Sequence, residues 1–261
     1  NFISYINASN GMAAGNTLEE AIIQATCEIF ERHTQIQIIK PEQTIPTIDK
    51  NTLENDRLKS MMAFYENENV EIILKDFSMG GQFPSIGALF VNHNLRPGKM
   101  EHKILIPGVS FNLEEALSRC LTEYMQGRGS LKASRPNMDR PVVHRSRLSN
   151  FYLMFKCCVS QKDISFLEKG DTIPFRESLN GDILSEIEAI KKICRDLDTD
   201  FIVLDLTHPI LDFPVVRVVL PGISDFLPFV HNDILTSVDT SPDSVWHGEP
   251  FKSVMDSFFQ T

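Results

Sequence analysis

Apolar side chains recur at helical spacing in several stretches of the chain. Residues Leu18 to about Thr34 and Leu113 to Gln126 have the three- and four-residue spacing of amphipathic helices. Thr17 and Asn112 directly precede these runs and are good N-cap residues. Two further helices are predicted, over about residues 53–65 and 187–197.

Short runs rich in Val, Ile and Leu predict strands between these helices. The predicted strands cover residues 3–6, 70–74, 86–91, 104–109, 201–206 and 215–220, with a turn at 78–82 and a short helix at 251–259. The runs at 201–206 and 215–220 are so apolar that we expect buried strands there. Strands alternating with helices predict an α/β (α+β) fold of repeated strand–helix modules and layered mixed sheets. Because no linker is evident, we expect residues 1–261 to form a single domain.

Composition narrows the classes of partner. Hydrophobic residues make up 42% of the 261, which is enough for a sizeable core, and the net charge is −10. An acidic chain is repelled by nucleic acid and by anionic membranes, so we expect neither as a partner. No apolar run has the length of a membrane span. Polyphosphate can still bind if a cation lies between it and the carboxylates.

The five cysteines do not form a disulfide framework or a zinc ribbon, because their number is odd and no CxxC pair occurs. Three of them lie in predicted helices, where a buried free thiol is expected, and this favours a reducing, cytoplasmic location. The segment 127–150 carries six basic residues and one acid between Arg128 and Arg147. A surface segment is the favoured interpretation, and a partner-binding loop is the alternative.

The acidic helix occurs twice, 95 residues apart. Leu18-Glu19-Glu20-Ala21 aligns without a gap on Leu113-Glu114-Glu115-Ala116, and Glu28 aligns on Glu123. Acids after an N-cap suit the helix dipole, so part of this similarity is common to helix starts. The later glutamates have no such explanation.

Each copy combines carboxylates with arginine. Glu28 and Glu31 share a helix face with Gln24, and Glu123 shares the equivalent face with Gln126 and Arg119. Mg²⁺ takes one or two carboxylates and leaves room for phosphate oxygens, which arginine binds well. The alternative is two solvated helices whose Glu–Arg pairs contribute about 0.3 kcal/mol each. Both interpretations stay open on spacing alone.

Several separated motifs resemble the YcaO family and occur in its order between residue 9 and about residue 228. They are Ser9-Asn10-Gly11-Met12-Ala13-Ala14-Gly15-Asn16-Thr17, Glu28-Ile29-Phe30-Glu31-Arg32, Gly80-Gly81-Gln82-Phe83-Pro84, Thr122-Glu123-Tyr124-Met125-Gln126-Gly127-Arg128 and Val216-Arg217-Val218-Val219-Leu220-Pro221-Gly222. The details are most similar to the stand-alone bacterial branch of the family. That branch has been linked to methylthiolation of a ribosomal protein.

The resemblance implies an enzyme that uses ATP and Mg²⁺ to activate a backbone amide of a peptide or protein substrate. A nucleophile adds to the amide carbon, ATP phosphorylates the oxyanion, and phosphate then leaves. By position, the resemblance assigns Glu28, Glu31 and Glu123 as catalytic and metal-binding residues. It assigns Asn16, Glu20, Arg32, Arg119, Gln126 and Arg128 to the nucleotide. It also implies a homodimer.

One departure from the family pattern concerns its nucleotide and metal site. The family has an earlier SxxExxER helix, preceded by a glycine loop with a lysine, and no equivalent is found here; Ala25 stands where that motif has serine. We therefore expect the back two thirds of a YcaO domain, in which ATP binding is weakened or lost. The alternatives are a non-catalytic scaffold that binds a partner through strand edges or the basic segment, and a two-metal nuclease, which the charge disfavours.

Overall fold

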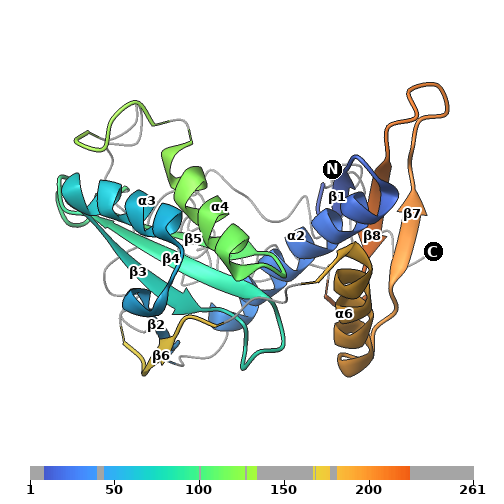
Figure 1. Ribbon diagram of the computed structural model, residues 1–261, viewed down its shortest axis with the longest axis horizontal. Coiled ribbons are helices and arrows are strands. Elements are labelled where there is room, and N and C mark those ends of the chain that lie inside the picture. The colour runs from blue at the N-terminus through green and yellow to red at the C-terminus, as the bar shows by residue number, and fades with distance from the viewer. Residues whose placement is uncertain are drawn as a thin grey trace, which may run out of the picture.

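The computed structural model describes residues 9–39, 44–99, 101–126, 128–133, 167, 169–176 and 181–223. The predicted strand at 3–6, most of the basic segment and the predicted helix at 251–259 lie outside these residues. A five-stranded sheet and a three-stranded sheet are joined by one long helix, α2 (Figure 1). The predicted α/β class with layered mixed sheets is confirmed.

The described elements mix strands and helices along the chain, with β3 to β5 and β7 to β8 as runs of consecutive strands. They are β1 (Met12–Ala14), α2 (Leu18–Ile39), β2 (Thr47–Asp49), the 3-10 turn η1 (Lys50–Thr52), α3 (Asp56–Asn67), β3 (Val70–Asp76), β4 (Ser85–Asn92), β5 (Lys103–Val109), α4 (Leu113–Met125), β6 (Thr172–Pro174), α6 (Ile183–Asp196), β7 (Ile202–Asp205) and β8 (Val215–Val219).

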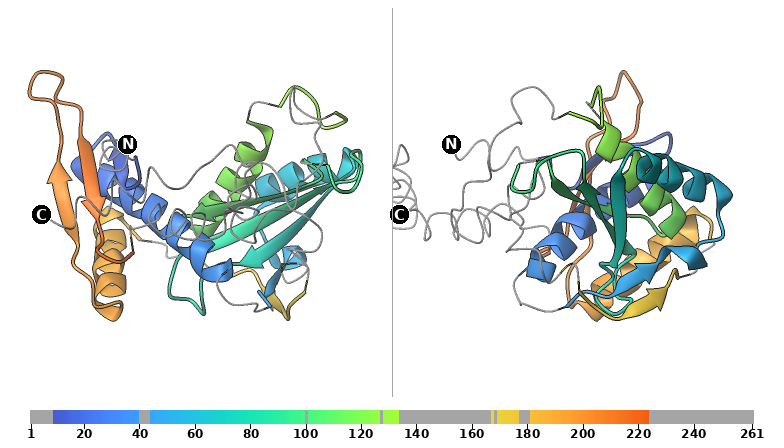
Figure 2. Two further views of the ribbon diagram at one scale, coloured as in Figure 1. Left: turned by 180° about the vertical axis from the view of Figure 1, so that it is seen from behind. Right: turned by 90° about the vertical axis from the view of Figure 1, so that its left-hand side faces the viewer.

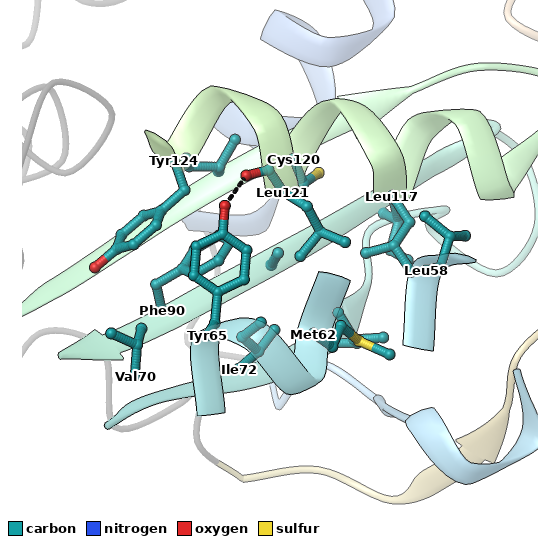
Figure 3. Close-up of a cluster of buried hydrophobic side chains, with 14 of the residues drawn as sticks. Leu58, Met62, Tyr65, Val70, Ile72, Phe90, Leu117, Cys120, Leu121 and Tyr124 are labelled. Atoms are coloured by element: carbon teal, nitrogen blue, oxygen red, sulfur yellow. Dashed lines mark hydrogen bonds between the residues drawn. The ribbon is translucent and has the colours of Figure 1, made fainter. Parts of the chain in front are cut away.

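The larger sheet has five strands in the order β5-β4-β3-β2-β6. All neighbouring pairs are antiparallel except β2 and β6. Helices α3 and α4 cover one face and bury apolar side chains against β3, β4 and β5. The hydroxyl of Tyr65 on α3 donates to the carbonyl of Leu121 on α4, which ties the two helices together above the sheet (Figure 3).

The end of α2 covers the opposite face of this sheet. Ile38 packs there with Leu89 of β4 and Leu105 of β5. The first half of α2 belongs to another core, in which Ala21, Ala25 and Ile29 pack with α6 and β8. One helix thus reaches from the small sheet to the large one (Figure 2).

The smaller sheet has the order β1-β8-β7 and is antiparallel. Here one prediction is wrong: β7 is not a buried strand, because all four of its residues are exposed. It lies at one edge of this sheet, and among the residues described its strand partner is β8. In β8 buried and half-buried positions alternate, so Val216 and Val218 alone are fully buried. An apolar run does not distinguish a strand that is covered from one that is not.

Two helices begin at other residues than predicted, because a capping side chain fixes where each one starts. Helix α3 starts at Asp56 rather than near residue 53, because the Asn55 side chain accepts a hydrogen bond from Leu58 N. Helix α6 starts at Ile183, four residues before the predicted position, because Asp182 caps it by accepting from Ser185 N. In the part of the chain that the structure describes, no helix combines the length and apolar character of a membrane span.

Candidate nucleotide and metal site

The two copies of the acidic helix, α2 and α4, line one groove over β5. The groove has a volume of about 760 Å³. Its floor is formed by Pro107 and Val109 of β5 and its walls by side chains of the two helices. The residues on the walls are Gln24, Cys27, Glu28, Glu31, Arg32, Arg119, Thr122, Glu123, Met125 and Gln126.

Equivalent positions of the two copies face each other. Arg119 Nη2 donates to Gln24 Oε1 at 2.9 Å, and these two residues are 95 positions apart, which is the shift that aligns the helices. Glu28 and its counterpart Glu123 line the same groove. The repeat therefore brings like residues together in space.

Close packing holds α4 against the floor of this groove. A Cβ on Gly108 of β5 would lie 2.4 Å from the carbonyl oxygen of Ala116 and 2.8 Å from Cys120 Sγ. Only glycine fits at that distance. The absent side chain lets α4 lie low enough on β5 for its carboxylate to reach the groove.

The three carboxylates are held in an environment that disfavours their charge. Burial raises the pKa of Glu31 to about 7, against a lowering effect of Arg32, and the charges of Glu123 and Glu28 raise it further. Burial also raises the pKa of Glu28, although Gly11 N–H donates to Glu28 Oε2 at 3.3 Å. Desolvation also raises the pKa of Glu123, although this residue is exposed at the rim of the groove. A bound cation would favour the charged form of all three carboxyl groups and lower their pKa values.

Arg32 and Arg119 supply positive charge near the three carboxyl groups but do not outweigh the effect of burial on their pKa values. Arg32 Nη1 lies 3.7 Å from Glu31 Oε1, which is longer than a strong hydrogen-bonded ion pair. Arg119 is exposed and is bound to a neutral amide. Both guanidinium groups line the groove beside the carboxylates, where they could reach an anionic ligand.

The donor set fits a magnesium ion shared with a phosphate ligand. Among the residues described, no three His, Cys, Asp or Glu side chains are close enough together to enclose a metal ion. Mg²⁺ does not need such a cage, because it binds through one or two carboxylates and completes its shell with water and phosphate oxygens. Glu28 and Glu31 on α2 and Glu123 on α4 are the side chains that could hold it.

Cys27 also lines the groove but does not offer a thiolate. Burial raises its pKa to about 12, against a lowering effect of Arg119. The thiol stays neutral at physiological pH, so it is a weak nucleophile there.

The groove does not include three of the predicted residues, Asn16, Glu20 and Arg128. The carboxylate of Glu20 accepts from Asn16 N at 2.9 Å and from Asn16 Nδ2 at 3.0 Å. Thr17 Oγ1 accepts from Glu20 N at 3.2 Å. These contacts resemble a capping box and bind the pair to the start of α2.

Arg128 is buried next to the groove, in a structural setting. Its Nη2 lies 3.1 Å from Glu101 Oε1, and its Nε donates to the carbonyl of Tyr124 at 2.8 Å. The guanidinium also lies 4.4 Å from the centroid of the Tyr124 ring. Arg128 lines a second, smaller cavity that adjoins the groove.

Gln35 lines the same second cavity and was missed by the sequence reasoning. It lies four residues after Glu31, which is one helical turn further along the same face of α2. That spacing is the signal that could have identified it.

Comparisons with known proteins show which family the chain belongs to. The model of the family described as YcaO cyclodehydratase, ATP- and Mg²⁺-binding, matches residues 3–224. The chain belongs to the YcaO family. The cofactors predicted from the sequence, ATP and Mg²⁺, are those in the family's description.

Two relatives are informative. An uncharacterized protein of Haemophilus influenzae is 30% identical over 233 residues, which are 87% of this chain and 38% of that protein. The ribosomal protein S12 methylthiotransferase accessory factor YcaO of Escherichia coli is 25% identical over 280 residues, covering 98% of this chain and 44% of that protein. The chain thus spans less than half the length of these two relatives.

Solved structures share the fold. The heterocyclase TruD has a TM-score of 0.60 and 26% identity, with 82% of this chain and 29% of TruD covered. YcaO from Methanopyrus kandleri, bound with AMPPCP and Mg²⁺, has a TM-score of 0.55 and 20% identity, with 92% of this chain and 60% of that one covered. Both support a YcaO-type fold for the described elements.

Proposed function

We propose that this YcaO domain takes part in ATP- and Mg²⁺-dependent activation of a backbone amide in a peptide or protein. The observation that carries the proposal is the convergence of Glu28, Glu31 and Glu123 with Arg32 and Arg119 on one groove. Carboxylates hold Mg²⁺, and guanidinium groups neutralise phosphate charge. Bound Mg²⁺ would supply charge stabilisation for the phosphate oxygens.

The roles of the residues follow from phosphoryl transfer, which needs mainly positioning and electrostatic stabilisation. Glu28 and Glu31 on α2 and Glu123 on α4 line the groove from two helices and would hold the metal ion there. Arg32, Arg119 and Gln126 lie where they could orient phosphate oxygens. The amide oxygen, once a nucleophile has added to its carbon, would accept the phosphoryl group from ATP.

Binding of nucleotide to this chain is the direct test. We expect titration calorimetry to detect AMPPCP in the presence of Mg²⁺, and Glu123→Gln to weaken it at least about tenfold through loss of a metal ligand. Glu19→Gln is the matched control, because Glu19 is an exposed acid of α2 outside the groove. Equal affinities in Glu123→Gln and Glu19→Gln would refute the assignment of the metal site.

Three features of the biology belong to the same proposal. The Escherichia coli relative's name supports a link to methylthiolation of a ribosomal protein. The buried free thiols Cys27, Cys120 and Cys194 support a reducing, cytoplasmic location. We also propose a homodimer, which sedimentation of the complete protein would test.

A non-catalytic scaffold is the second candidate, and one observation favours it. Strand β7 has an exposed apolar edge, which is the kind of surface that recruits a strand from a partner. The calorimetry distinguishes the two candidates. Absence of Mg²⁺–AMPPCP binding, both here and in the complete protein, would favour the scaffold.

A further inference from the structure

A second cavity of about 260 Å³ adjoins the groove at its carboxylates. The two spaces share Glu31, Arg32, Pro107, Glu123 and Gln126. The cavity is much larger than the roughly 30 Å³ that one water molecule occupies in the liquid. It can therefore hold part of a ligand beside whatever the groove binds.

Gln35 gives this cavity an unused hydrogen-bonding group. Its side chain is almost completely buried, with 1% of the residue exposed. Neither Nε2 nor Oε1 has a hydrogen-bond partner among the residues described. A buried carboxamide with no partner is unfavourable, and native proteins keep one mainly where a ligand or water completes it.

Arg128 adds a buried positive donor to the same cavity. Glu101 and the carbonyl of Tyr124 fix the guanidinium through Nη2 and Nε. Its Nη1 is buried and has no partner in the described part of the chain. The group is rigidly held and keeps one donor for a ligand.

We propose that this cavity binds the backbone amide that is to be activated. The carbonyl of the amide to be activated belongs to a residue whose own N–H is part of the preceding peptide bond. When that residue is extended, its N–H and C=O point to the same side and match the acceptor and donor of the Gln35 carboxamide. Gln35 Oε1 accepts from that N–H, and Gln35 Nε2 donates to that carbonyl. Arg128 Nη1 donates to the same oxygen. The inference rests on the proposed function, because it places the amide beside the carboxylates that hold the metal.

The chemistry of the cavity favours an amide over a nucleotide base. A glutamine can also pair with the edge of adenine, but a neutral base gains little from a buried guanidinium. An amide oxygen that becomes an oxyanion gains much more, because a charged donor is most effective where negative charge develops. The larger groove remains for the nucleotide.

Two small probes test this with the chain as it is. The first probe is N-acetyl-alanine N-methylamide, and the second carries a methyl group in place of the alanine N–H. NMR titrations, with and without Mg²⁺–AMPPCP, should show about tenfold tighter binding of the first probe, the value expected for one buried hydrogen bond. Gln35→Leu and the closer-shaped Gln35→Met should abolish this preference. Neither variant should lower the midpoint of thermal unfolding.

Gln37→Leu is the matched control, because Gln37 is a half-buried glutamine of α2 outside both cavities, and it should keep the preference. The inference is overturned if the preference survives in both Gln35 variants, or if the unmodified chain binds neither probe. A loss of AMPPCP affinity in the Gln35 variants overturns it too, since the cavity would then hold nucleotide. Probe selectivity without AMPPCP binding, both here and in the complete protein, would support the amide site and reject ATP dependence.

Discussion

Glu31 is one of the residues that line both cavities. Its side chain is 24% exposed and lies between Arg32 and two other glutamates. Because burial outweighs the attraction of Arg32, its pKa is raised to about 7. This carboxyl is therefore partly protonated at neutral pH, and a metal ion must displace that proton to bind.

The affinity of Mg²⁺–AMPPCP should consequently depend on pH. We expect it to rise about tenfold from pH 6 to pH 8, as a carboxyl with a pKa of about 7 loses its proton. Calorimetry across this range measures the change. Glu31→Gln should flatten the profile and Glu19→Gln should not; a flat profile in the unmodified chain would contradict the expectation.

Without metal, the same carboxyl affects stability in the opposite direction. The pKa of Glu31 is higher in the folded chain than the unfolded value near 4.5, so the folded state binds more protons between these values. Its contribution is fully present below pH 4.5 and is lost as pH rises through about 7. Glu31→Gln should therefore raise the free energy of unfolding at pH 8 by about 1–3 kcal/mol in chelator.

At the scale of elements, the seating of α4 on β5 sets the depth of the groove. Gly108 leaves no room for a side chain beneath Ala116 and Cys120. On the other side of α4, Leu117, Leu121 and α3 fill the space over the sheet. This packing fixes how α4 lies on β5, and the position of the Glu123 carboxylate on α4 is fixed with it.

Gly108→Ala should lift α4 and damage both folding and binding. We expect a loss of about 1–3 kcal/mol in the free energy of unfolding, which is the usual cost of overpacking. Urea denaturation measures this loss. Gly129→Ala is the control, since a Cβ there meets nothing within 4 Å; equal losses in both variants would contradict the role of close packing.

At the scale of the whole molecule, β7 forms one edge of the small sheet in the part of the chain that the structure describes. The outer strand β7 and the turn that follows expose large apolar side chains. These are Ile202, Val203, Leu204, Leu206, Ile210, Leu211 and Phe213. An apolar edge strand with free backbone groups tends to pair with another strand.

This edge should drive self-association of the 261-residue chain. Leu204→Lys is expected to shift sedimentation toward monomer with little change in thermal midpoint, because Leu204 is already 45% exposed. Leu184→Lys tests whether any added charge has the same effect, since Leu184 is 66% exposed on helix α6. Equal shifts in the two variants would mean that the strand edge is not responsible.

Local patterns alone determined much of this protein. Apolar periodicity predicted α2, α4 and the central strands, because a helix or strand with one buried face carries that face in its sequence. The spacing of Glu28, Glu31 and Glu123 left a metal site and two solvated helices both open; the family motifs assigned these residues to one site, and all three line one groove. The family motifs could be read in the same way, because each lies within a short segment.

Tertiary structure decided what depends on neighbours distant in sequence. It left β7 uncovered, because burial of a strand is set by what packs on it and not by its own apolar residues. It bound Arg128 to Glu101 inside the protein. It also placed Gln35 beside Arg128 in a second cavity. Such contacts join separate helices and loops, and packing alone fixes them.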